Sequence, residues 1–283
     1  MSDIEPEFPV KQRGPLISFF AAGWSNLVRL MASNALFVIF NIPALIIAAI
    51  LSAQFVPWLF STVIDFSDYI DPVTGSDEGV LQLYVFLVLF LLTFLVSGNL
   101  ICIGPFQTGF TSVYIDIFNE ESVSFFDSFK AGMKAGWKKG IVSMLIGFIF
   151  TPVIFLAIGF YLNFRSVTGN AIAIVFIVIL FAFILIQNFV YNLIVSTDLS
   201  LGKIYKNAFL FVLLRFIPNL GLTLVIGVFY IAVPFFLIMS ASYITLGIFM
   251  FLYSFLVVSW VQYFISYYSG RLIGKYVDSG KDA

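Results

Sequence analysis

The residues best suited to chemistry in this chain fall into two groups of uncharged polar side chains. The first group repeats at the i and i+4 spacing of one helix face and consists of Gln187, Asn188, Tyr191 and Asn192. The second group runs along a stretch near the end of the chain and consists of Ser259, Gln262, Ser266 and Ser269. Between apolar helices, such groups either line a groove for a substrate or partner, or hydrogen-bond neighbouring helices at about 0.6–2 kcal/mol per contact. Both interpretations stay open.

An acidic stretch, "DFSDYIDPVTGSDEG", offers oxygen ligands for a cation. It spaces Asp65, Asp68 and Asp71 three residues apart, and Asp77 and Glu78 follow. Calcium prefers oxygen ligands, but this spacing is not that of an EF-hand loop. A solvated negative loop explains the stretch equally well, so no metal site is predicted there.

The composition removes most catalytic chemistry. The chain has no histidine and one cysteine, Cys102. A disulfide within the chain and a cysteine–histidine metal cluster are therefore excluded, and a histidine-based triad has no base. Cys102 lies between two isoleucines and is expected to act as a small hydrophobic residue. We expect no enzyme, metal or cofactor, and the net charge of −1 argues against a nucleic-acid partner.

Two lysine-bearing segments could bind anions or acidic surfaces. In "SFFDSFKAGMKAGWKKG", Phe126, Phe129, Met133 and Trp137 are predicted to line one helix face and lysines another. A shorter segment, "DLSLGKIYKNAFLFVLLR", places two lysines near its start. The candidate contact residues of both segments are Lys130, Lys134, Trp137, Lys138, Lys139, Lys203 and Lys206. They favour lipid headgroups or the acidic surface of a partner.

The elements that must position these residues are membrane helices. Of 283 residues, 61% are hydrophobic and 10% are charged, so the solvent of this surface is lipid. A crossing takes about 20 apolar residues, and only a helix satisfies its backbone there. The sequence predicts an all-α, six-span protein, with a turn at "MSASY" dividing the last long apolar interval. The spans are 31–56, 80–103, 140–163, 171–196, 217–239 and 243–268.

The distribution of charge predicts the orientation of these spans. The connection at 57–79 carries five acidic residues and no basic one, 164–170 carries only Arg165, and 239–243 carries neither sign. The other 13 of the 14 basic residues lie on the opposite side. Because positive charge accumulates on the cytoplasmic side, both termini are expected to be cytoplasmic. Residues 1–14, which lack signal-peptide features, and 276–283 are then tails, and 15–275 form one transmembrane domain.

A helix break interrupts the apolar run at "ICIGPFQTGF". Gly104 and Pro105 are predicted to end the second span, and Gly109 to let the chain turn along the membrane surface. Residues 106–139 would then form a cytoplasmic amphipathic segment, with a new helix starting at the capping-box pattern "SFFD".

Two further segments resemble this one and suggest a repeat. In residues 15–34, the weak polar face would comprise Ser18, Ala22, Ser25, Arg29 and Ser33. Together with the lysine-bearing segments, this gives a possible threefold repeat of surface helix, proline-kinked span and return span.

The stretch from "IGPFQTGF" to "GWKKG", together with "DLSLGKIYKNAFLFVLLRFIPNL", resembles the YesL-like family of bacterial integral membrane proteins. The resemblance covers residues 18–240, and its motifs are structural; the acidic loop at 57–79 is longer than the family pattern. It implies a plasma-membrane protein of no established activity, often encoded beside carbohydrate ABC importers.

We therefore expect a non-enzymatic accessory subunit that contacts the lipid bilayer and the permease subunits of an ABC-type oligosaccharide importer. The alternative is a stand-alone carrier or channel for a small neutral solute. Gln187, Asn188, Asn192, Ser259, Gln262 and Ser266 would then bind the solute.

Overall fold

The computed structural model describes residues 14–41, 46, 50, 103–122, 124–239 and 243–276, and in that part of the chain every regular element is helical. The predicted all-α class is confirmed for these residues. The elements are α1 (Pro15–Ser25), α2 (Leu27–Phe40), α5 (Pro105–Phe118), α6 (Phe125–Asn163), α7 (Val167–Ser196), α8 (Leu201–Leu214), α9 (Phe216–Gly227), the π-helical turn η1 (Val228–Ala232), α10 (Val233–Met239), α11 (Tyr243–Phe255) and α12 (Val257–Tyr276).

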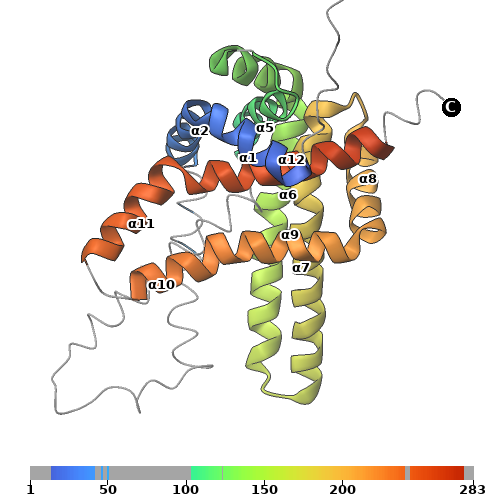
Figure 1. The fold of residues 1–283 in the computed structure, drawn as a ribbon. Helices are drawn as coiled ribbons and strands as arrows, with labels where there is room; N and C mark the ends of the chain where they lie inside the picture. Colours follow the sequence, from blue (N-terminus) through green and yellow to red (C-terminus); the bar gives the residue numbers. More distant parts are fainter. Residues whose placement is uncertain are drawn as a thin grey trace, which may run out of the picture.

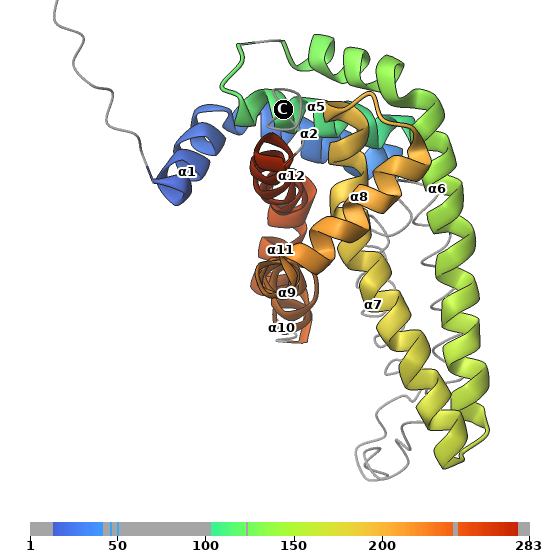
Figure 2. The same ribbon diagram turned by 90° about the vertical axis from the view of Figure 1, so that its right-hand side faces the viewer.

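Two sets of helices run in different directions. In Figure 1, α6 and α7 form a long hairpin that extends downward from a cluster containing α1, α2, α5 and part of α12. The segment α9–η1–α10 and the helix α12 run across this hairpin, and Figure 2 shows both of them end-on. Since membrane spans tilt by about 20° on average, a bilayer normal drawn along the hairpin leaves α9–η1–α10 lying across it.

Three helical stretches are long and apolar enough to cross a membrane: Phe125–Asn163, Val167–Ser196 and Phe216–Leu237. A fourth results if Gly247–Phe255 and Val257–Tyr276, which are bent by 43° at their junction, count as one broken span. The described residues thus show three or four candidate spans, and the six predicted ones are not shown. Residues 42–45, 47–49 and 51–102 lie outside the described residues, and with them most of the second half of the span at 31–56, the acidic loop and all but the last residue of the span at 80–103.

The helix α6 is longer than predicted because the surface helix and the span at 140–163 are continuous. It begins after Ser124, as the sequence predicts, although the Ser124 side chain makes no capping hydrogen bond. Figure 2 shows its first turns passing over the top of the molecule before the helix curves down beside α7. In the third predicted repeat, by contrast, α8 and α9 are separated at Arg215. The repeat therefore stays a prediction.

The helix α5 lies in the core, whereas the sequence predicts a surface segment. Phe110, Val113 and Ile117 have no exposed area, and Tyr114 has 1%. Gly104 adopts a φ of 59° immediately before Pro105, which starts α5 at a position where its missing N–H costs nothing.

Glycines explain how closely α5 and α6 approach. Gly109 lies inside α5 rather than at a turn, and a Cβ there would be 2.8 Å from the carbonyl oxygen of Phe129. A Cβ on Gly132 would be 2.4 Å from Cβ of Ser112, and one on Gly136 would be 2.8 Å from Cγ2 of Thr108. The turning role predicted for Gly109 is therefore wrong: this residue permits helix contact, as small residues do between membrane helices.

The first amphipathic segment exposes large apolar side chains and buries part of its weak polar face, although Ser25 of that face stays exposed. Ala22 and Ser33, from the weak polar face, are buried. The strongly exposed side chains are apolar, and they are Leu16, Ile17, Phe20, Trp24 and Val28. An apolar outer face is expected of a helix that contacts lipid rather than water.

Asparagine side chains bridge the breaks between consecutive helices. The Nδ2 group of Asn34 donates to the carbonyl oxygen of Tyr253 at 2.8 Å, and its Oδ1 accepts from the Ser259 N–H at 2.8 Å. These two backbone groups flank the break between α11 and α12. Asn219 acts similarly after α8, where its Nδ2 donates to the carbonyl oxygens of Phe211 at 3.0 Å and Val212 at 3.4 Å. The backbone groups that a break leaves open thus find partners away from water.

The π-helical turn η1 joins α9 to α10. It ends at Ala232, two residues before Pro234. The Val233 N–H bonds to the carbonyl oxygen of Val228, five residues back. The carbonyl oxygen of Phe229, which an α-helix would pair with Val233, instead accepts from the Tyr253 hydroxyl. In the π-helical register the next partner of the Phe229 carbonyl would be residue 234, but Pro234 has no N–H, and α11 supplies the replacement partner.

Candidate functional site

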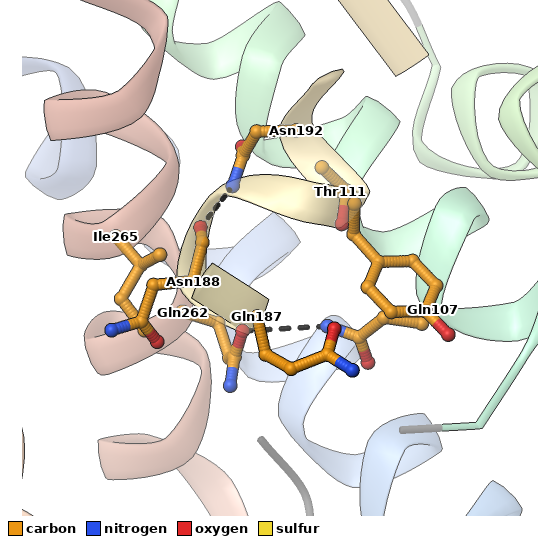
Figure 3. Close-up of a pocket in the computed structure, with 8 residues that line it drawn as sticks. Gln107, Thr111, Gln187, Asn188, Asn192, Gln262 and Ile265 are labelled. Carbon is orange, nitrogen blue, oxygen red and sulfur yellow. Dashed lines mark hydrogen bonds between the residues drawn. The ribbon is translucent and has the colours of Figure 1, made fainter. Parts of the chain in front are cut away.

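The predicted polar residues of α7 and α12 meet in a buried cavity of about 20 Å³. Its walls come from α5, α7 and α12, and Figure 3 shows the Gln107 amide directed toward Gln262 and the Asn192 amide directed toward the backbone oxygen of Asn188. The lining residues are Gln107, Thr111, Gln187, Asn188, Tyr191, Asn192, Gln262 and Ile265. The geometry therefore joins Gln262 of the second predicted group to the first group and adds Gln107 and Thr111 from α5.

Helical periodicity explains why these side chains converge. Residues 187, 188, 191 and 192 occupy one face of α7 near its end, and that face is turned toward the other helices. Gln262 belongs to the buried stripe of α12, and Gln107 and Thr111 are one turn apart on the buried helix α5.

One chain of hydrogen bonds links α5 to α12 and to the π-helical turn. The Nε2 group of Gln107 donates to Oε1 of Gln262 at 3.3 Å, and Nε2 of Gln262 donates to the Tyr230 hydroxyl at 3.4 Å. The Tyr230 hydroxyl in turn donates to the carbonyl oxygen of Val258 at 3.5 Å. Gln262 is thus held from both sides.

A second set of hydrogen bonds fixes α7. The Tyr191 hydroxyl donates to the carbonyl oxygen of Gly140 at 3.3 Å, and Nε2 of Gln187 donates to the Tyr205 hydroxyl at 3.5 Å. The backbone oxygen of Asn188 accepts from Nδ2 of Asn192 at 3.1 Å and from the Ser269 hydroxyl at 3.3 Å. The face of α7 is therefore anchored to α6, α8 and α12.

Several polar atoms of the cavity have no hydrogen-bond partner among the residues that the structure describes. They are Oε1 of Gln107, Oε1 of Gln187, Oδ1 of Asn192 and Nδ2 of Asn188. All four side chains are at most 5% exposed. A buried polar group without a partner costs about 1–3 kcal/mol, so four of them around one cavity indicate that a polar ligand or water belongs there.

The other residues of the α12 stripe serve helix packing. Ser259 is fully buried, and its hydroxyl accepts from the Tyr114 hydroxyl at 3.1 Å. Burial raises the pKa of the Tyr114 phenol, so this hydroxyl stays a donor at neutral pH. Ser266 is also buried but does not line the cavity. Neither serine therefore belongs to the site.

The predicted cationic contacts lie on the surface. Lys130, Lys134 and Lys138 are exposed on successive turns of α6, and Trp137 beside them is 52% exposed. Lys139 is partly covered, and Lys203 and Lys206 are exposed on α8. The predicted aromatic face lies within the single helix α6, and burial differs along it: Phe129 is buried, whereas Phe126 and Trp137 are exposed.

A half-buried carboxyl group lies near the start of α6. Burial raises the pKa of Asp116 above its ordinary value, and the Glu121 carboxylate adds to this effect. A hydrogen bond with the Ser128 side chain of α6 opposes it, and the Arg29 guanidinium does so less strongly. The Arg29 guanidinium also donates to the carbonyl oxygen of Glu121 at 3.2 Å. Within the described residues no group of three or more acidic, histidine or cysteine side chains could hold a metal, and Cys102 and the acidic stretch at 65–78 lie outside them.

An apolar groove of about 510 Å³ separates α1 from the crossing helices. Its walls include Phe20 and Trp24 of α1, Phe229 of η1 and Trp260 of α12. It carries none of the amide groups found in the polar cavity.

A scan against protein families, a search of curated proteins and a search of solved structures found no match to this chain. The class rests on the described residues themselves, which form an all-α protein with candidate transmembrane helices and a buried polar cavity.

Proposed function

We propose that this chain is a non-enzymatic accessory subunit of the bacterial plasma membrane, with both termini cytoplasmic, that associates with the permease subunits of an ABC-type oligosaccharide importer. The importer is suggested by the resemblance to the YesL-like family. The membrane role rests on α6, a single helix that carries exposed lysines at its start and exposed apolar side chains further along.

The surface of α6 changes character along its length. Lys130, Lys134 and Lys138 are exposed near its start, whereas Ile149, Val153 and Leu156 are each more than half exposed beyond the middle. Lysines near an anionic membrane surface contribute about 1 kcal/mol each, and exposed apolar side chains are stable against lipid tails or partner helices. The helix therefore fits a position that begins at the headgroups and continues into the bilayer.

The size of the polar cavity supports an assisting role over sugar transport by this chain. Sites for small organic molecules measure about 300–1,000 Å³, whereas this cavity measures about 20 Å³. The groove of about 510 Å³ is large enough, but its lining lacks the amides that would bind sugar hydroxyls.

Co-purification tests the proposal. The tagged full-length chain, isolated in mild detergent from its native host, is expected to enrich permease subunits of a carbohydrate importer. A tagged, unrelated membrane protein expressed at the same level is the control. Recovery of this chain alone would contradict the proposal.

The second candidate is a stand-alone carrier or channel for a small neutral solute, and the unpartnered amides of the cavity favour it. Saturable solute uptake by vesicles containing only this chain would support it. Uptake should then fall at least tenfold with Gln187→Met, because the variant keeps the shape of Gln187 and removes its amide.

A further inference from the structure

We infer that the buried polar cavity between α5, α7 and α12 is a binding site for a single dehydrated monovalent cation, of the Na⁺ or K⁺ class. Amide oxygens of Gln107, Gln187 and Asn192 would hold the cation. This site does not depend on the accessory role proposed above, because its ligands belong to this chain alone.

Within the described residues, the cavity contains more unpartnered hydrogen-bond acceptors than donors. Three of the four unpartnered atoms are carbonyl oxygens: Oε1 of Gln107, Oε1 of Gln187 and Oδ1 of Asn192. A ligand that satisfies three acceptors must be positive or rich in donors, and neutral carbonyl oxygens are the groups that replace the hydration shell of alkali cations in membrane proteins.

Neighbouring hydrogen bonds orient these oxygens. The nitrogen of Gln107 is committed to Gln262, that of Gln187 to the Tyr205 hydroxyl, and that of Asn192 to the backbone oxygen of Asn188. With each nitrogen engaged, each amide presents its oxygen at the other end. Preorganised ligands bind more tightly because less motion is lost on binding. Asn188 presents a nitrogen, and rotation of its amide would exchange that nitrogen for oxygen.

The small volume of the cavity and its uncharged lining favour a dehydrated monovalent ion. A volume of about 20 Å³ holds one water-sized particle and excludes a hydrated ion. The residues that line the cavity carry no formal charge. Burial of a divalent ion would therefore be uncompensated, whereas the smaller desolvation cost of a monovalent ion can be met by several dipoles.

Thermal unfolding of the purified full-length chain in uncharged detergent tests the site. Melting temperatures are measured in NaCl, KCl and choline chloride at equal ionic strength. We expect a saturable rise with NaCl or KCl over choline chloride, of about 5 °C when the cation exceeds its Kd about 100-fold. Equal melting temperatures in all three salts would show that water fills the cavity and would overturn the proposal.

Single substitutions test whether the salt-specific rise in melting temperature comes from this cavity. Gln187→Met and Asn192→Leu should abolish the salt-specific rise, whereas Asn170→Leu, at an exposed position on the same helix, should retain it. Gln187→Glu adds a compensating charge and should lower the cation concentration needed for half of the rise at least tenfold. If the amide variants fail to fold, the Gln187→Glu titration still decides, because an unchanged midpoint would contradict a cation at this site.

Discussion

Asn34 shows how one side chain can hold two helices at a break. Its amide pairs with a carbonyl oxygen of α11 and an N–H of α12, and the residue has no exposed area. Asn219 closes the break after α8 and also accepts from the Tyr268 hydroxyl at 2.8 Å. In the sequence these residues look like isolated polar substitutions in apolar segments, and only the breaks explain them.

Replacement of Asn34 should therefore lower the free energy of unfolding. Asn34→Leu would leave the Tyr253 carbonyl and the Ser259 N–H without partners, and we expect a loss of about 2–4 kcal/mol in the free energy of unfolding. Asn34→Asp keeps the acceptor and should lose less. Chemical denaturation followed by circular dichroism measures both, and equal stability of Asn34→Leu and the wild type would refute the bridging role.

Asp116 gives the stability of the described helices a pH dependence. Because the folded state raises its pKa, folding favours the protonated acid. The contribution is fully present below the unfolded-state pKa and is lost as pH rises through the higher folded-state pKa.

Asp116→Asn should therefore raise the melting temperature at neutral pH and change it little at acidic pH. Melting curves from pH 3 to pH 8 would reveal this difference. A variant that melts below the wild type at neutral pH would indicate that the Ser128 hydrogen bond and the Arg29 attraction together outweigh burial.

At the scale of elements, the pair α5–α6 depends on small residues. The sequence repeats glycine at 132, 136 and 140, and the four-residue spacing was visible there. The aromatic and lysine periodicities of the same segment are stronger than this glycine stripe and therefore dominate the prediction. Those patterns predict a helix correctly but do not show which face is packed.

Gly132→Ala tests the contact. Its Cβ would lie 2.7 Å from the Thr108 carbonyl oxygen, so the helices must separate. We expect a loss of about 1–3 kcal/mol in the free energy of unfolding. The matched control is Gly159→Ala in the same helix, which meets nothing within 4 Å and should be neutral or stabilising by up to about 1 kcal/mol. Similar losses in both variants would rule out close packing as the cause.

At the scale of the molecule, the helical class and the end of α7 at Ser196 follow from hydrophobic runs, whereas α7 begins at Val167, four residues before the predicted start. The directions of the helices do not, because composition measures apolar length and carries no information on how helices cross. The same limit applies to the cavity: spacing placed Gln187, Asn188 and Asn192 on one face, whereas the contribution of Gln107 required the burial of α5.

Cysteine labelling in intact cells tests whether the α6–α7 hairpin runs along the membrane normal. In a background with Cys102→Ser, a cysteine at Ser166, in the turn between α6 and α7, should react with an impermeant maleimide added outside intact cells. A cysteine at Lys134 should react only after the membrane is opened. Equal labelling of both positions from outside would contradict the crossing of the hairpin.

The bridge at Asn34 also constrains the order of biosynthesis. Its partners lie 219 and 225 residues further along the chain, so at about 5–20 residues per second the ribosome needs about 10–45 seconds to supply them. During that interval the amide must stay hydrated or be shielded by the insertion machinery. A nascent chain cut short before Tyr253 would keep this amide exposed, which makes it a mark by which quality control could recognise unfinished copies.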